Sequence, residues 1–296
     1  DIKTIRDLCP VDQYTGGIEH ATMHLLYFRF FTKALADIGI IDFREPTKKL
    51  FNQGMILGED HEKMSKSRGN VVNPDDLVKK YGTDTVRAYL MFLGPWDAGA
   101  PWNPHGIEGL ARFFKGVWSL CHLKIKKDIE QNKNLEKQLL KSLNQTIKKT
   151  KEDYESFRFN TAIAAMMSFR NTLKTSTEAA GTDVWKECLE KLLLILAPVA
   201  PHLTEELWNK INPNEGSVHI QEWPEYDQEL ANEEKITLVI QVNGKVRDKF
   251  EMIKGVGKSE SEKKALESSK VIPFIKDKKI LKVIFVPDRL VNIVCN

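Results

Sequence analysis

The spacing of apolar residues changes along the chain from a helical period to a period of 2, so its parts must fold differently. Over residues 106–223 apolar residues recur at helical spacing, which predicts antiparallel helices packed as a bundle. Past Pro224 the pattern alternates over residues 236–242, and the Asn243-Gly244 pair that follows is typical of a hairpin turn. A helix signal and a second hairpin over 280–294 complete a predicted ββαββ tail.

The sequence before the bundle mixes helix and strand signals. It predicts a helix over 17–39, a buried strand over 50–57 and a polar loop over 58–70. Asn73-Pro74-Asp75-Asp76 is typical of a helix start, Gly82 of its end, and a second helix is expected over 83–93. We therefore expect a multidomain fold, α/β at first and all-α later, with a small α+β tail.

Composition excludes several classes of protein. The sequence has no apolar run of about 18 residues, so no membrane-spanning helix is expected. It begins at Asp1 without Met or a signal-like segment, which indicates a fragment or a processed chain. The four scattered cysteines contain no CxxC pair and indicate reduced thiols, as in a cytoplasmic protein. A net charge of +3 allows a nucleic-acid partner without requiring one.

The pentapeptide Lys63-Met64-Ser65-Lys66-Ser67 is the motif that carries the most chemistry. Two ammonium groups on a loop can bind the oxygens of a triphosphate as point charges. When a carboxylate attacks the α-phosphorus, negative charge grows on the departing pyrophosphate, and positioned lysines stabilise it. The alternative is an ordinary solvated surface loop.

A second motif, Gly16-Gly17-Ile18-Glu19-His20, precedes the first long predicted helix. The two glycines allow a ligand close to the backbone at a helix N-terminus, and Glu19 can accept hydrogen bonds from ribose hydroxyls. His20 and His24 are four residues apart and share a helix face. They could bind a metal, but no third ligand is evident, so we predict a packed or substrate-facing pair and no metal site.

These motifs and several others, in this order, resemble the C-terminal part of the bacterial leucyl-tRNA synthetases, which are class I aminoacyl-tRNA synthetases. The resemblance rests on GGIEHATMHL (16–25), NQGMIL (52–57), KMSKS (63–67), NPDD (73–76), YGTDTVR (81–87), FNTAIA (159–164) and QVNGKVR (241–247). It implies four regions: the end of a Rossmann catalytic domain (1–57), a KMSKS and stem-contact segment (58–105), a helical anticodon-binding domain (106–225) and a C-terminal tRNA-binding domain (234–296).

The resemblance implies ATP-dependent activation of leucine to leucyl-adenylate and its transfer to tRNA(Leu), with Mg²⁺ accompanying ATP. It assigns Lys63 and Lys66 to catalysis at the phosphates, Tyr14 and His24 to the leucine pocket, and a larger set to ATP. That ATP-binding set is Gly16, Gly17, Glu19, His20, Lys63, Met64, Ser65, Lys66 and Ser67.

The departures from the family pattern lie in what the chain lacks. The HIGH-type half-site and the editing insertion are absent, so the chain is expected to be a truncated polypeptide or one subunit of a split enzyme. We expect it to be inactive in adenylation alone and to need a second chain, or a missing N-terminal segment, that carries the HIGH half.

Basic residues suggest where RNA binds. In the tail, Lys245, Arg247 and Lys249 alternate on a predicted strand, which would place three cations on one face for phosphate contacts. In the bundle, cations gather in two clusters, for which a solvated helix face is an equal alternative. These are Lys124, Lys126 and Lys127, then Lys148, Lys149 and Lys151, with Arg158 and Arg170 nearby.

The aromatic residues of the bundle are expected in its core, and the sequence assigns them no base-stacking role. They are Trp118, Phe157, Phe159, Trp185 and Trp208.

Two alternative functions of the whole chain stay open. One is a non-catalytic tRNA-binding module that has kept the motif. The other is a sister synthetase for another aliphatic amino acid, and the residues around His24 would distinguish it from the leucine enzyme.

Overall fold

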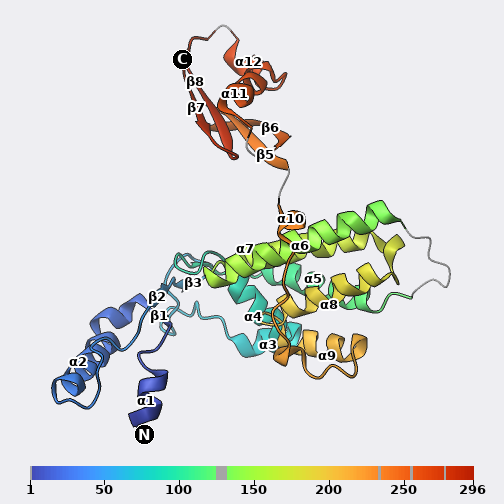
Figure 1. Cartoon of the computed structure of the whole chain (residues 1–296). Helices are drawn as coiled ribbons and strands as arrows, with labels where there is room; N and C mark the ends of the chain where they lie inside the picture. The colour runs from blue at the N-terminus through green and yellow to red at the C-terminus, as the bar shows by residue number, and fades with distance from the viewer. Residues whose placement is uncertain (1, 125–131, 233–234, 254–255, 277) are drawn as a thin grey trace. The chain divides into compact units, whose positions relative to one another are not determined.

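The computed structural model describes residues 2–124, 132–232, 235–253, 256–276 and 278–296 (Figure 1). The chain divides into two units, residues 1–230 and residues 231–296. Among the described residues, no helix is both long enough and apolar enough to cross a lipid bilayer.

The first unit starts with two parallel strands that carry the glycine motif. Its first elements are α1 (Ile2–Leu8), β1 (Tyr14–Gly17), the 3-10 helix η1 (Ile18–Thr22), α2 (His24–Asp37) and β2 (Leu50–Gln53). β1 pairs with β2 in parallel, and Gly16 lies opposite Asn52. The single helix predicted over 17–39 is wrong at its start, because η1 precedes α2 and the two meet at Met23, which has non-helical dihedral angles.

The strand predicted over 50–57 is two strands with different partners. β2 ends at Gln53, and β3 (Ile56–Leu57) pairs in parallel with β4 (Ala100–Pro101). The chain between them passes close to another backbone segment: a Cβ added at Gly54 would lie 2.0 Å from the backbone nitrogen of Gly99. Only glycine allows this approach, which brings the connector after α4 against the strands.

Among the described residues, seven long helices make up most of the rest of the first unit, as the apolar periodicity predicts. They are α3 (Pro74–Tyr81), α4 (Thr83–Phe92), α5 (Gly106–Cys121), α6 (Lys133–Glu155), α7 (Phe159–Thr175), α8 (Asp183–Leu196) and α9 (Pro201–Ile211). The start predicted for α3 is confirmed, since the Asn73 side chain accepts a hydrogen bond from the Asp75 backbone N–H at 3.1 Å. Gly82, with φ of 86°, separates α3 from α4.

One continuous core fills this bundle. Its largest fully buried side chains come from α4 to α8 and are Tyr89, Ile107, Leu110, Phe113, Leu139, Leu143, Ile147, Ile163, Met166, Phe169, Leu173 and Leu192. The expectation of a buried core position holds for Trp185 and Trp208, which are 4% and 5% exposed. It is wrong for Trp118, which is 41% exposed.

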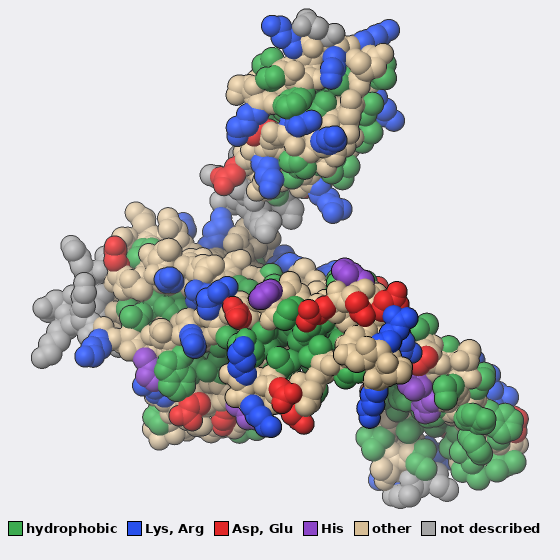
Figure 2. Space-filling view, turned by 180° about the vertical axis from the view of Figure 1, so that it is seen from behind, with side chains coloured by type: hydrophobic (Ala, Val, Ile, Leu, Met, Phe, Trp, Pro, Cys, Tyr) green, Lys and Arg blue, Asp and Glu red, His purple; other side chains and the backbone are tan. Residues whose placement is uncertain are grey.

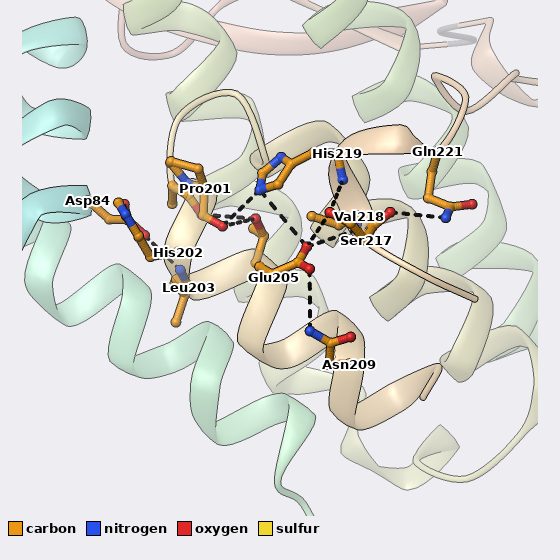
Figure 3. Close-up of polar contacts among 12 residues, drawn as sticks. Asp84, Pro201, His202, Leu203, Glu205, Asn209, Ser217, Val218, His219 and Gln221 are labelled. Carbon is orange, nitrogen blue, oxygen red and sulfur yellow. Dashed lines mark hydrogen bonds and ion pairs between the residues drawn. The ribbon is translucent and has the colours of Figure 1, made fainter. Parts of the chain in front are cut away.

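A carboxylate from α4 caps the N-terminus of α9 (Figure 3). Asp84 Oδ2 accepts a hydrogen bond from the Leu203 backbone N–H at 2.7 Å, and Oδ1 lies 2.7 Å from His202 Nδ1. A carboxylate of α9 makes a similar contact with the segment that follows the helix. Glu205 Oε2 accepts a hydrogen bond from the Val218 backbone N–H at 2.9 Å. These contacts satisfy N–H groups that a helix N-terminus leaves without partners.

The short elements between and after these helices are η2 (Thr177–Ala179), η3 (Val218–Ile220) and α10 (Gln228–Ala231). The second unit then has the order ββααββ, in which α12 is a short helix added to the ββαββ order that the sequence predicts. Its elements are β5 (Lys235–Val242), β6 (Lys245–Ile253), α11 (Lys258–Glu267), α12 (Ile272–Ile275), β7 (Ile280–Val286) and β8 (Leu290–Cys295).

The four strands of the second unit form one mixed sheet in the order β6-β5-β8-β7. β5 and β8 pair in parallel at its centre, while the two hairpins are antiparallel. Asn243 and Gly244 have φ of 49° and 78°, which confirms the predicted two-residue turn. Apolar side chains such as Ile240, Val291 and Ile293 are fully buried in the core of this unit.

Candidate functional site

A cavity of about 330 Å³ opens where β1 and β2 meet the start of α2. Its lining includes five of the residues that the sequence singled out, which are Tyr14, Gly16, Gly17, His20 and His24. Thr15, Leu25, Leu50 and Asn52 complete the lining. Strand ends beside a helix start are a common place for small-molecule sites in α/β folds, because the backbone there exposes unpaired N–H groups.

Rings form one wall of this cavity. The Tyr14 hydroxyl lies 2.5 Å from His24 Nε2, and His24 is stacked on Phe28 with ring centroids 5.3 Å apart. His20 meets His24 edge to face at 6.0 Å. The two histidines are thus close, but the prediction that they share one helix face is wrong, because His20 lies in η1 and His24 begins α2 after the break at Met23. Within the described ranges no group of three metal-binding side chains forms around them or elsewhere.

Glu19 turns back over the backbone of Gly17. A Cβ added at Gly17 would lie 2.3 Å from Glu19 Oε2, so a side chain there would force the carboxylate to move. Glu19 is exposed and lines a neighbouring cavity of about 780 Å³, which also includes Gly17 and Asn52. The structure therefore places Glu19 beside the first cavity and not in its lining.

Asn52 is a residue that the sequence reasoning missed. It lies on β2, lines both cavities, and its buried Oδ1 has no hydrogen-bond partner. Buried acceptors are almost always paired, so this oxygen is available to a donor from a ligand. A polar residue inside an otherwise apolar predicted strand was the available signal.

The KMSKS segment is an exposed loop held by one asparagine. The Asn70 carboxamide accepts the Ser65 backbone N–H at 2.8 Å and donates to the carbonyl oxygen of Lys63 at 3.3 Å. Its Nδ2 also donates to Asp60 Oδ2 at 3.0 Å. A hydrogen bond from the Glu62 backbone N–H is the main cause that holds the pKa of Asp60 below its usual range, so this carboxylate stays ionised.

The two lysines of the loop are free to bind an anion. Lys63 and Lys66 are exposed, and neither ammonium group has a hydrogen bond or ion pair to a residue that the structure describes. Met64 is half-buried against the bundle core, while the hydroxyls of Ser65 and Ser67 lie 3.2 Å apart. The loop is thus anchored at Met64 and Asn70 and presents its cations to solvent. It does not contribute to the lining of either cavity.

The row of three cations predicted in the tail is interrupted at Arg247. Ile240 pairs with Asp248 but Gln241 pairs with Val246, so Arg247 lies in a β-bulge. Its guanidinium carbon lies 3.7 Å from the centre of the Phe274 ring, and its Nε is buried without a hydrogen bond. The prediction of one line is therefore wrong. Lys245 and Lys249 are both exposed, but the bulge puts them on opposite faces, since Lys245 pairs with Val242 and Lys249 with Val239.

The cations predicted in the bundle divide into paired and unpaired ones. Lys149 and Arg158 both bind the buried carboxylate of Asp153, at 2.6 Å and 2.8 Å. Arg170 lies over the Phe113 ring at 5.8 Å, with a buried Nε that has no partner. Lys124, Lys148 and Lys151 are not paired with any described residue. Lys126 and Lys127 lie outside the described residues.

Two family models match the chain. Residues 3–98 match tRNA synthetases class I (I, L, M and V), and residues 136–264 match the anticodon-binding domain of tRNA ligase. Among curated proteins, the leucine–tRNA ligase of Dehalococcoides mccartyi strain 195 is 51% identical over 99% of this chain. That of Rubrobacter xylanophilus is 50% identical over 96% of it. The chain spans 36% and 34% of the lengths of these two relatives.

The solved structures that this chain resembles are also aminoacyl-tRNA synthetases. The LeuRS of Agrobacterium radiobacter K84, in a ternary complex described as LeuRS-tRNA-LeuAMS, is similar with a TM-score of 0.71 at 34% identity. The match covers the whole of this chain and 40% of that one. The methionyl-tRNA synthetase of Mycobacterium tuberculosis, with a TM-score of 0.55 over 69% of this chain and 45% of its own, shares only the fold, since the identity is 17%.

Proposed function

The chain belongs to the leucine–tRNA ligase family, and on that premise we propose that it supplies the phosphate loop and the tRNA-binding parts of such an enzyme. The reaction would be the ATP-dependent activation of leucine followed by transfer of the leucyl group to tRNA(Leu). The observation that carries the proposal is the pair of unpartnered ammonium groups, on Lys63 and Lys66, in a loop that Asn70 holds in place.

The proposed reaction needs positive charge beside the departing pyrophosphate. A carboxylate oxygen of leucine attacks the α-phosphorus of ATP, and the bond from that phosphorus to the pyrophosphate oxygen breaks. The pyrophosphate leaves with the negative charge, and Lys63 and Lys66 would stabilise that charge as it grows. Mg²⁺ would enter bound to the phosphates of ATP, as is usual for nucleotide substrates.

The cavity beside β1 would bind the adenosine and leucine parts of the reactants. Gly16 and Gly17 leave the backbone open to a ligand, and Glu19 would accept hydrogen bonds from the ribose hydroxyls. His20 would contact the adenosine. The hydrogen-bonded pair of Tyr14 and His24 would form a wall of the leucine pocket.

Further polypeptide is needed to complete this site. Apolar side chains of the α2 region are exposed and gather at the lower right of Figure 2, where Leu26, Tyr27, Phe30 and Phe31 are each about 60% exposed or more. A patch of this kind marks a surface that other protein covers. We propose that the rest of the family's catalytic domain covers it, from the same polypeptide or from a second chain.

The helical bundle and the tail would bind tRNA. Support comes from the match to the anticodon-binding model and from the tRNA named in the complex of the Agrobacterium relative. In the tail, Lys245 and Lys249 are the cations best placed for phosphate contacts, since Arg247 is packed on Phe274.

A chimeric enzyme, in which this chain replaces the matching part of a relative, tests this function. Residues 1–296 would be placed in the Dehalococcoides mccartyi ligase in exchange for the matching 36% of that enzyme, and leucine-dependent ATP–pyrophosphate exchange and leucylation of tRNA(Leu) would be measured. We expect both activities in the chimera and no exchange by residues 1–296 alone. A chimera that binds tRNA(Leu) but catalyses neither step would favour a non-catalytic tRNA-binding module instead. A chimera that activates another aliphatic amino acid in preference to leucine would indicate a sister synthetase.

A further inference from the structure

Trp118 is an exposed ring on a bundle that buries three tryptophans and half-buries Trp96 and Trp223. It lies near the C-terminal end of α5 and is 41% exposed, whereas Trp102, Trp185 and Trp208 are each 6% exposed or less. The buried stripe of α5 includes Leu110, Phe113 and Val117, and Trp118 lies about 90° from its centre by helix geometry. Large aromatic rings are usually mostly buried, so the exposed Trp118 ring is a candidate contact for a binding partner.

A histidine holds the Trp118 ring from one side. His122, one turn further on, is stacked on the indole with ring centroids 4.4 Å apart and planes 19° from parallel. His122 Nδ1 lies 2.8 Å from the carbonyl oxygen of Trp118 and donates to it, which fixes the imidazole. The pair is a rigid aromatic platform on the surface, ready to stack with a third planar group.

Two exposed lysines lie before and after this platform along the chain. Lys115 is one turn before Trp118 on the same face, and Lys124 follows the end of the helix; both are exposed. Neither ammonium group makes a hydrogen bond or an ion pair with any residue in the described part of the chain. On α8, by contrast, Lys186 and Lys191 are paired with Glu190 and Glu187.

A third cation reaches the same end of α5 from α9. The positive charge of Lys210 acts on the Cys121 thiol, where it opposes the larger effect of burial, which raises the pKa of Cys121 to about 12. Lys124 and Lys210 could be explained as complements of a helix C-terminus, but Lys115 lies in the interior of α5 and has no such role. Three cations, Lys115, Lys124 and Lys210, therefore lie along the C-terminal half of α5 or next to its end.

We infer that Trp118 and His122 form a stacking site for an unpaired base of the bound tRNA, with Lys115, Lys124 and Lys210 at the adjoining phosphates. Proteins recognise splayed bases by stacking them on aromatic side chains, while cations bind the backbone. A second copy of the chain is a poorer occupant, because a twofold contact through this face would bring the lysines of both copies into one interface. The inference rests on the tRNA-binding function proposed above.

The test compares the affinities of Trp118→Leu, Trp118→Phe and wild-type chain for a labelled tRNA(Leu) transcript and for a blunt RNA duplex without loops. Stacking of one base contributes roughly 1–3 kcal/mol, so Trp118→Leu should weaken tRNA binding by about 5- to 150-fold. Trp118→Phe should recover part of the loss, and binding of the duplex should not change. The tryptophan emission that is lost in Trp118→Phe should be quenched by the transcript in wild type.

Charge variants give an independent readout. Lys115→Gln should lower the magnitude of the log–log salt slope of tRNA binding by roughly 0.7 to 0.9, whereas the paired Lys186→Gln should leave it unchanged. These measurements keep the test decisive if Trp118→Leu does not fold. Equal tRNA affinity of folded Trp118→Leu and wild type, or an unchanged slope for Lys115→Gln, would overturn the inference. So would a wild-type dimer that Trp118→Leu dissociates in sedimentation. A wild-type chain that does not bind tRNA at all would overturn the proposed function itself.

Discussion

Asp153 is a small buried side chain whose replacement should lower the free energy of unfolding of the first unit. It is buried at the end of α6, with a side chain that is 0% exposed. Its carboxylate accepts hydrogen bonds from Lys149 in the same helix at 2.6 Å, from Arg158 in the turn at 2.8 Å and from Thr161 in α7 at 2.6 Å. The substitution Asp153→Asn keeps the shape and removes the charge.

The expected loss of stability is about 3 kcal/mol. Breaking a buried ion pair typically costs 3–5 kcal/mol, since it leaves charge without a partner. Here Lys149 and Arg158 are 48% and 53% exposed, so water would solvate them once released, and the cost lies at the low end of that range. For a unit of this size, about 3 kcal/mol corresponds to a fall in Tm of roughly 6–12 °C.

The loss of stability should also affect the cavity beside β1. The turn that Asp153 stabilises contains Phe157, which has a φ of 56° and rests on Phe51 of β2 with ring centroids 5.1 Å apart. Since Asn52 follows Phe51 and lines the cavity, a loosened turn should disturb the ligand site. Asp153→Asn should therefore lower ATP affinity in the chimeric ligase as well as stability.

Urea and thermal unfolding of Asp153→Asn measure the effect, with the exposed neighbour variant Glu152→Gln as control. Burial raises the pKa of Asp153, but the hydrogen bonds from Lys149, Thr161 and Arg158 together hold it below its usual range. A carboxyl whose pKa is depressed in the folded state stabilises the protein above its unfolded pKa, near 3.9, and loses that effect as the pH falls through the folded value. The difference between wild type and Asp153→Asn should thus be constant from pH 5 to 8 and shrink below about pH 4. A variant within about 0.5 kcal/mol of wild type at pH 7 would refute the reasoning.

Two further predictions concern the phosphate loop and the tail. Asn70→Ala should lower the rate of ATP–pyrophosphate exchange of the chimera by about 10- to 100-fold, because the loop loses its anchor, while Glu59→Gln in the same loop should have no effect. An unchanged rate in Asn70→Ala would show that Asn70 does not position the loop. In the tail, Lys245→Gln and Lys249→Gln should each reduce the magnitude of the salt slope of tRNA binding by roughly 0.7 to 0.9, and Lys258→Gln, which loses an ion pair with Glu262, should not. Equal slopes for all three variants would count against an RNA contact at this strand.

Local signals in the sequence predicted the helices and turns well, because their causes lie within a few residues. The Asn73 side chain caps α3, and the Asn243-Gly244 pair makes its hairpin, without help from distant parts of the chain. The start of α2 was missed for the opposite reason: nothing local marks Met23 as the break between a 3-10 turn and a helix.

Features that depend on contacts between distant residues could not be predicted. Periodicity put Trp118 on the apolar stripe of α5, but it does not say how wide a strip the neighbouring helices cover. Alternation put Arg247 in line with the lysines, and a bulge cannot be read from residue types alone. The orphaned oxygen of Asn52 depends on which strands pair around it.

The measurement that tests the account most directly is leucine-dependent ATP–pyrophosphate exchange by the chimeric ligase that carries Lys63→Ala and Lys66→Ala together. Removing one group that stabilises developing charge commonly costs 100- to 1,000-fold in rate, so we expect a fall of at least about 100-fold with the fold intact. Lys79→Gln, an exposed lysine of α3, is the matched control and should exchange at the rate of the unmodified chimera. If the double variant exchanges pyrophosphate within about twofold of that rate, these two ammonium groups do not stabilise the departing phosphates, and the central claim is contradicted.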